Sequence, residues 1–131
     1  MIILDENISR AQREALLKWK IKFKHIGYDL SYKGIIDENI IVVLHSLKQP
    51  TLFTWDNDLY HFKLLHKNYC IVYVDVKQKD VAVFTRKFLN NEMFDSKSQR
   101  MGKIVRITYE GIKWWEFSKG VEEQLFWKEL Q

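Results

Sequence analysis

Short apolar runs alternate along this chain with longer stretches in which apolar residues recur every three or four positions. These short, largely apolar segments cover residues 1–4, 51–54 and 71–76, and the first two lead directly into acidic turns. Runs of this length predict buried strands, and the intervening helical spacing predicts helices. Because strands that alternate with helices favour a parallel sheet covered on both faces, we expect an α/β fold.

Five helices are expected. The first follows Ser9 and Gln12, which have the spacing of a capping box, and the second begins at Asp37 as its N-cap and contains the apolar run 40–47. Pro50 marks where that second helix has ended. The remaining helices are expected over residues 59–66, 80–89 and 121–130.

Two further segments predict strands. Every second residue from 18 to 24 is a lysine, and the residues between them are apolar. This alternation predicts a strand with a lysine face that runs from a turn near Trp19 to Ile26, with a first helix continuing to Lys24 as the alternative. Residues 103–117 predict a hairpin that turns at Glu110 and Gly111.

Composition supports one domain covering residues 1–131. The chain is 47% apolar and contains one proline, and its length suits a single hydrophobic core. Its longest apolar runs fall far short of the roughly 18 residues that cross a bilayer. The lone Cys70 lies in a predicted strand and cannot form an internal disulfide, so we expect a cytoplasmic protein without a membrane segment.

The formal net charge of +4 suits an anionic partner such as RNA or DNA without requiring one. The chain contains no phosphate-binding glycine motif and no H-E-x-x-H or G-x-S-x-G sequence, which disfavours nucleotide cofactors and the hydrolases that use those motifs. We expect the four histidines to be surface or edge residues.

Acidic residues at the predicted ends of strands are the main candidates for chemistry. Asp5 and Asp56 each follow a predicted strand, Asp58 lies beside Asp56, and Asp37 begins the second helix. Because parallel strands end at one edge of their sheet, these carboxylates are expected to converge there. Clustered carboxylates usually hold a hard cation, here Mg²⁺ or Mn²⁺, that activates water for attack on a phosphodiester.

Each of these acids also has a structural interpretation. Asp37, Asp56 or Asp58 could cap a helix, and Asp5 could begin an Asx turn. Asp75 lies near another strand end, but we expect it to be exposed or to lie behind the metal ligands.

Basic and aromatic residues offer candidate contacts for a nucleic acid. The aromatic residues near the C-terminus could stack on bases, form a dimer surface or pack in the core; they are Trp114, Trp115, Phe117, Phe126 and Trp127. The candidate phosphate contacts are Lys18, Lys20, Lys22, Lys24, Lys33, Arg86, Arg100 and Lys103.

Several short motifs resemble those of the small PIN-like proteins of prokaryotes, and the resemblance covers almost the whole chain. The motifs are Leu4-Asp5-Glu6-Asn7, Asp37-Glu38 before Ile40, Thr54-Trp55-Asp56 with Asp58, Tyr69-Cys70-Ile71-Val72 and Arg100-Met101-Gly102-Lys103. The resemblance implies a PIN-like three-layer α/β/α sandwich with a central, mainly parallel sheet. It also implies a Mg²⁺- or Mn²⁺-dependent ribonuclease site like that of VapC-type toxins, whose partners include antitoxin proteins.

By position, Asp5 matches the acid after the family's first strand, and Asp56 matches the acid of its T-x-D turn. Asp37 or Glu38 matches the acid of the central helix, and Asp58 matches a more peripheral acid. The family helix carries a Glu in its interior, so which of Asp37 and Glu38 binds metal is open. The sequence is therefore compatible with two functions: a metal-dependent endoribonuclease acting on RNA or single-stranded DNA, and a catalytically inactive PIN-like module that binds nucleic acid or protein.

Overall fold

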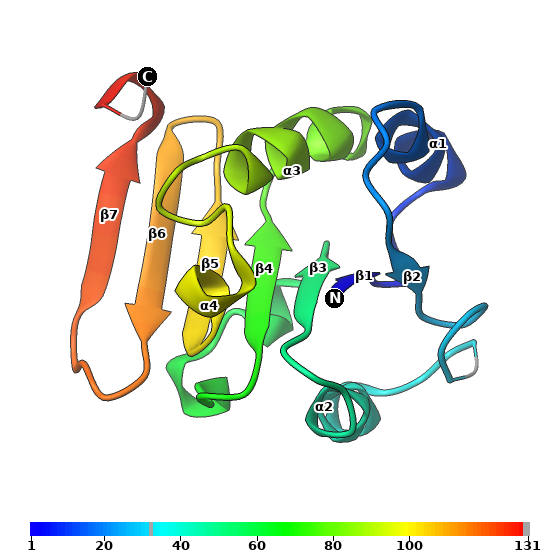
Figure 1. Ribbon diagram of the computed structural model, residues 1–131, viewed down its shortest axis with the longest axis horizontal. Helices are drawn as coiled ribbons and strands as arrows, with labels where there is room; N and C mark the ends of the chain where they lie inside the picture. The colour runs from blue at the N-terminus through cyan, green and yellow to red at the C-terminus, as the bar shows by residue number, and fades with distance from the viewer. Residues whose placement is uncertain (32, 130–131) are drawn as a thin grey trace.

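The computed structural model describes residues 1–31 and 33–129, and the strands among these residues form one mixed sheet (Figure 1). Its strands, in the described residues, are β1 (Ile2–Leu4), β2 (Lys24–His25), β3 (Thr51–Thr54), β4 (Cys70–Val74), β5 (Lys103–Ile107), β6 (Gly111–Glu116) and β7 (Glu122–Phe126). They lie in the order β2-β1-β3-β4-β5-β6-β7, parallel from β2 to β5 and antiparallel beyond. The α/β class and the mostly parallel sheet are confirmed.

Helices cover both faces of this sheet. The α-helices are α1 (Arg10–Lys18), α2 (Asp37–His45), α3 (Val81–Leu89) and α4 (Lys97–Arg100), and the 3-10 turns are η1 (Asn57–Leu59), η2 (Phe62–Leu64), η3 (Gln78–Asp80) and η4 (Trp127–Glu129). In Figure 1, α1 and α3 lie along one border of the sheet and α2 along the other. None of the described helices has the length and apolarity needed to cross a membrane.

Two apolar cores lie on opposite faces of the sheet. One contains Leu16 of α1 and Phe88 of α3 against alternate strand residues such as Phe53. The other contains Ile40 of α2 and Leu59 of η1 against Leu52, the neighbour of Phe53 in β3. Since successive side chains of a strand point to opposite faces, each apolar strand is buried on both sides.

The strand order places a topological switch between β1 and β3. From β1 the chain crosses one face through α1 to reach β2, and it crosses the other face through α2 to reach β3. In open α/β sheets a crevice forms at such a switch, beyond the carboxyl ends of the strands. The residues that directly follow β1 and β3 here are Asp5 and Trp55.

The predicted C-terminal helix over residues 121–130 is wrong in the described part, and Leu130 lies outside the described residues. Residues 122–126 form β7, which pairs antiparallel with β6. Val121, Leu125 and Phe126 suit a helix by spacing, but the edge of β6 offers backbone partners that local spacing cannot reveal. The expected 103–117 hairpin is confirmed as β5 and β6.

Three other local predictions need correction. Residues 59–66 form no α-helix but the two 3-10 turns η1 and η2, and the lysine-rich strand is reduced to the two residues of β2 after a turn at Trp19. The capping box after Ser9 is absent, because Gln12 instead accepts a hydrogen bond from the Ala82 amide at 2.8 Å. Tertiary contacts override the local signal in each case.

Candidate metal centre

Three carboxylates converge at the site. Asp37, Asp56 and Asp58 each offer one oxygen atom, and these atoms all lie within 4.8 Å of one another. Asp37 is the first residue of α2, whereas Asp56 and Asp58 belong to the turn that carries the chain out of β3 into η1. We call these three residues the acidic trio.

The turn after β3 fixes two members of the acidic trio. Asp56 is the N-cap of η1, and its Oδ1 accepts a hydrogen bond from the Asp58 amide at 2.9 Å. The capping interpretation of Asp56 is therefore confirmed, but it uses one of the two carboxylate oxygens. Asp37, predicted as the N-cap of α2, is instead its first helical residue, and Ile36 occupies the cap position without a side-chain hydrogen bond.

No lysine or arginine among the described residues forms an ion pair with the acidic trio. Partial burial raises the pKa of Asp37, and the nearby carboxylates of Asp56, Asp58, Asp5 and Glu38 raise it further. Oxygen ligands that repel one another in this way suit a hard divalent cation such as Mg²⁺ or Mn²⁺. The residues present thus fit the ion that the sequence predicts.

Asp5 lies beneath the acidic trio and is 3% exposed. Its Oδ1 accepts from the Glu6 amide at 2.8 Å, and its Oδ2 accepts from the Thr54 hydroxyl at 2.6 Å. Burial raises the pKa of Asp5, although these two hydrogen bonds oppose the shift. Both oxygens already accept hydrogen bonds, and the assignment of Asp5 as a metal ligand stays a prediction.

Thr54 connects Asp5 to the acidic trio. Its hydroxyl donates to Asp5 and accepts from the Asp56 amide at 3.1 Å, so one buried side chain orients both acids. Sequence reasoning did not assign Thr54 a place in the site. The available signal was Thr54 itself, the threonine of the T-x-D turn that ends β3 directly before Trp55 and Asp56.

Glu6 fixes the approach to α2. Its two carboxylate oxygens accept from the Gly34 amide at 3.1 and 3.0 Å, which ties the end of β1 to the loop before Asp37. Gly34 has a φ of +78°, a backbone conformation that costs glycine little. Glu6 therefore supports the position of Asp37 although it is not a member of the trio.

Glu38, the alternative to Asp37, is exposed and lies outside the acidic trio. It lines a groove with Asp37 and Asp58, whose apolar wall consists of Ile41, Leu59 and Leu64. The geometry favours Asp37 over Glu38 as the ligand from α2, and Glu38 as a ligand stays a prediction.

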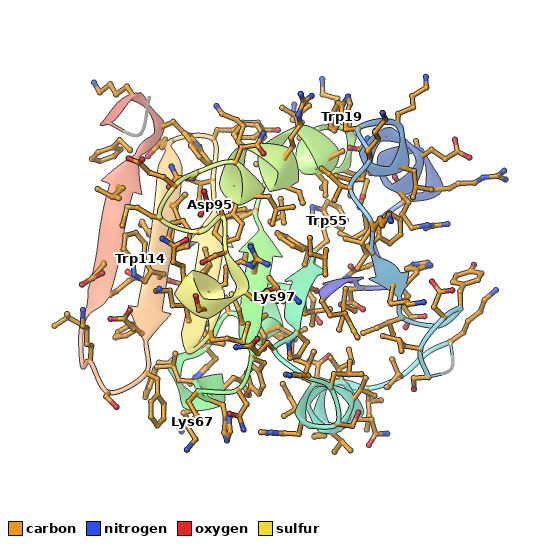
Figure 2. The ribbon with its side chains drawn as sticks, in the orientation of Figure 1. Trp19, Trp55, Lys67, Asp95, Lys97 and Trp114 are labelled. Carbon is orange, nitrogen blue, oxygen red and sulfur yellow. The ribbon has the colours of Figure 1, made fainter. Side chains whose placement is uncertain are left out.

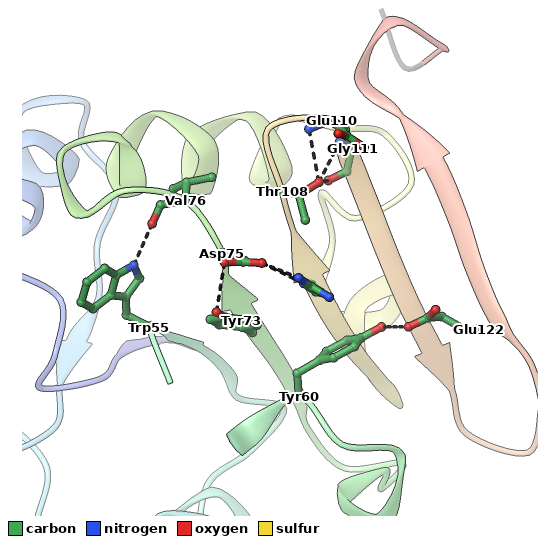
Figure 3. Close-up of polar contacts among 10 residues, drawn as sticks. Trp55, Tyr60, Tyr73, Asp75, Val76, Thr108, Glu110, Gly111 and Glu122 are labelled. Carbon is green, nitrogen blue, oxygen red and sulfur yellow. Dashed lines mark hydrogen bonds and ion pairs between the residues drawn. The ribbon is translucent and has the colours of Figure 1, made fainter. Parts of the chain in front are cut away.

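Neighbouring strand ends carry a second polar group (Figure 3). Asp75 accepts from the Tyr73 hydroxyl at 3.0 Å and from Arg106, whose Nε and Nη2 lie 3.0 and 2.6 Å from Oδ2. This partner accounts for the charge of Asp75, which was not predicted as a ligand. The Trp55 indole donates to the Val76 carbonyl at 2.8 Å, so the ring is held beside β4 while 43% of the residue is exposed.

Several predicted surface residues are instead buried or paired. His25 is 4% exposed, and its Nε2 has no hydrogen-bond partner among the described residues. Arg100 is also buried and donates to Thr51 and to the Phe94 carbonyl, each at 2.9 Å, while Lys103 forms an ion pair with Glu116. Arg100 is therefore unsuited to contact phosphate, and the prediction that His25 lies at the surface or an edge is wrong.

No family model matches the sequence, and no curated protein or solved structure is detectably similar to the chain. The case for a function thus depends on the geometry of the acidic trio and its surroundings.

Proposed function

We propose that this protein is a metal-dependent nuclease with a PIN-like site, specifically an endoribonuclease of the cytoplasm. The observation that carries the proposal is the convergence of Asp37, Asp56 and Asp58 from two separate chain segments within 4.8 Å. The trio adjoins the β1–β3 switch, where open α/β sheets bind their ligands. A role as the toxin of a toxin–antitoxin pair belongs to the same proposal.

In this proposal the acidic trio holds Mg²⁺ or Mn²⁺. The bound ion supplies Lewis acidity toward a phosphodiester and makes water a stronger nucleophile. Asp5 orients Asp56 through the Thr54 hydroxyl, and Glu6 secures the loop that leads to Asp37. These contacts hold the carboxylates in position before substrate arrives, which lowers the cost of assembling the site.

Hydrolysis by this route requires no covalent nucleophile from the protein. The single cysteine, Cys70, is fully buried in β4, and burial raises the pKa of its thiol to about 12. A thiol of that kind is inert as a nucleophile near neutral pH. The chain therefore offers acids for metal-assisted hydrolysis and no reactive thiol for covalent catalysis.

A second function is favoured by one specific observation. Both oxygens of Asp5 accept hydrogen bonds from Glu6 and Thr54, so the acid that matches the first PIN-like position is already satisfied within the protein. A site in which this acid is structural suits a PIN-like module that binds nucleic acid or protein without cleaving it.

Cleavage assays separate the two functions. Labelled RNA and single-stranded DNA oligonucleotides would be incubated with the protein in Mg²⁺, Mn²⁺ or EDTA. We expect cleavage of RNA that requires metal, with a loss of at least about a hundredfold for Asp56→Asn and for the Asp5→Asn, Asp56→Asn double variant. Asp95→Asn is the matched control, because Asp95 is exposed on the loop before α4, which covers the other face of the sheet.

Cleavage that survives the double variant would contradict the assignment of the site. Oligonucleotide binding without cleavage in any metal would support the non-catalytic module.

A further inference from the structure

A cluster of rings, exposed at His61 and Phe62 and half-buried at Trp115, lies on the same face of the sheet as the acidic trio. Phe62, the first residue of η2, is 52% exposed. Its ring centroid lies 5.0 Å from that of His61, nearly parallel, and 5.7 Å from that of Trp115 on β6. We call His61, Phe62 and Trp115 the ring platform.

The ring platform is held by its own segment although it faces solvent. His61 is the N-cap of η2, and its Nδ1 accepts from the Lys63 amide at 3.1 Å. The preceding Tyr60 hydroxyl donates to the Glu122 carboxylate on β7, which ties the segment across the sheet (Figure 3). Rings fixed in this way lose little freedom when a ligand stacks on them.

The chain places the ring platform close to the acidic trio. Phe62 follows Asp58 by four residues, so even a fully extended backbone would keep their Cα atoms within about 14 Å. Stacked nucleotides rise about 3.4 Å each, so a strand held at the trio reaches Phe62 within about four nucleotides. Asp58 lies within η1 and Phe62 begins η2, so the segment is not fully extended and the actual path is shorter.

Positive charge accompanies the rings. Lys63 is exposed directly after Phe62 and forms no ion pair with any described residue. Lys113 lies on the sheet face that Trp115 shares, whereas Arg106, opposite Lys113 across β5 and β6, is already paired with Asp75. Aromatic surfaces combined with cations are the usual means by which proteins hold single-stranded nucleic acid.

We propose that the ring platform stacks an unpaired nucleobase of the strand whose phosphodiester lies at the acidic trio. The inference rests on the proposed nuclease function and adds a specificity-determining residue, Phe62. A base within a duplex has both faces covered by its neighbours, so the platform selects single-stranded substrate. The rings accept a base of RNA or of DNA, and stacking does not distinguish ribose from deoxyribose.

Fluorescence of 2-aminopurine tests the platform apart from cleavage. RNA and DNA oligonucleotides with this base at successive positions, single-stranded or in a duplex, would be titrated with the protein in EDTA and in Ca²⁺. We expect quenching on single strands at one position or two adjacent positions. Phe62→Ala should abolish the quenching and weaken binding about tenfold, and Phe62→Trp should retain both.

Trp19→Ala is the matched control, since Trp19 is an exposed aromatic residue that ends α1 on the other face of the sheet. In Figure 2, Trp19 lies near α1 at one border of the molecule. Lys67, which follows the end of η2 by three residues, lies at the opposite border. Circular dichroism would verify that each variant is folded, which the exposure of Phe62 leads us to expect.

The platform is refuted if no single strand is quenched, if Phe62→Ala stacks the base as well as the unmodified protein does, or if a duplex binds equally well. Cleavage in Mg²⁺ on the same oligonucleotides distinguishes the two proposals. Cleavage without quenching would support the nuclease function and refute base stacking on the ring platform. Quenching without cleavage would support base stacking and refute the nuclease function. If Phe62→Ala abolished the binding of a protein partner but left the binding of oligonucleotides unchanged, these rings would be a protein-binding surface instead.

Discussion

Asp37 illustrates how a candidate ligand lowers the stability of the protein that carries it. Burial and neighbouring carboxylates raise its pKa above the ordinary value of 3.8, and burial does the same for Asp5. The folded protein therefore binds these protons more tightly than the unfolded chain does. As pH rises from about 3.8 through the raised pKa values, the free energy of unfolding contributed by these groups falls, and it stays lower at neutral pH.

We predict that Asp37→Asn stabilises the metal-free protein at pH 7 by about 1 kcal/mol, because it removes a half-buried charge that faces other carboxylates. The gain should shrink below pH 4, where the unmodified side chain is itself protonated. Urea unfolding in EDTA at several pH values measures both effects. Asp95→Asn should change stability by less than about 0.5 kcal/mol, and equal gains in both variants would contradict the explanation.

At the scale of elements, the sequence predicted the strands whose local pattern is unambiguous. β1, β3 and β4 are short, largely apolar and mostly buried, and polar residues follow each of them, so their pattern has one interpretation. β7 lies at the edge of the sheet with exposed and half-buried residues alternating, and its pairing with β6 is the decisive contact. That contact joins residues brought together by the fold, which local periodicity does not encode.

The close approach of β6 and β7 gives a stringent test of that pairing. A Cβ atom on Gly111 would lie 2.0 Å from the Leu125 carbonyl oxygen and 2.8 Å from the Phe126 Cα. Gly111→Ala should therefore force the two strands apart and lower the free energy of unfolding by roughly 3 kcal/mol. Chemical denaturation measures the change.

Gly120→Ala is the matched control, since a Cβ there meets nothing within 4 Å and stability should stay within about 0.5 kcal/mol of the original. A tolerated alanine at Gly111 would show that β7 does not pair with β6 in solution as described.

At the scale of the whole molecule, the site could be predicted only as far as strand ends and motif spacing allow. The convergence of Asp37, Asp56 and Asp58 agrees with the expected meeting of acids at one edge of the sheet. The burial of Asp5 and its link through Thr54 depend on the pairing of β1 with β3, and the choice between Asp37 and Glu38 depends on where α2 begins. Both are consequences of packing, which a single sequence leaves open.

Metal binding should stabilise the entire domain. A ligand that binds only the folded state at one hundred times its Kd adds about 2.7 kcal/mol, which corresponds to a rise in Tm of roughly 10 °C for a chain of this size. We expect Mn²⁺ to produce a rise of this kind, EDTA to reverse it and Asp56→Asn to abolish it. Calorimetry measures the shift.

Asp95→Asn should retain the full response to Mn²⁺. A shift of equal size in Asp56→Asn would place the ion elsewhere than at the acidic trio.

The position of β7 at the end of the sheet also bears on how the protein behaves when crowded. Within the described residues no strand covers its outer edge, so its backbone groups could template pairing with a second molecule. Glu122 and Glu123 are consecutive residues of this strand and point to opposite faces, and although Glu123 lies 3.8 Å from Lys119, acidic side chains on both faces disfavour the approach of an identical edge. Replacing both carboxylates with neutral side chains would thus remove a barrier to self-association at the border of the sheet.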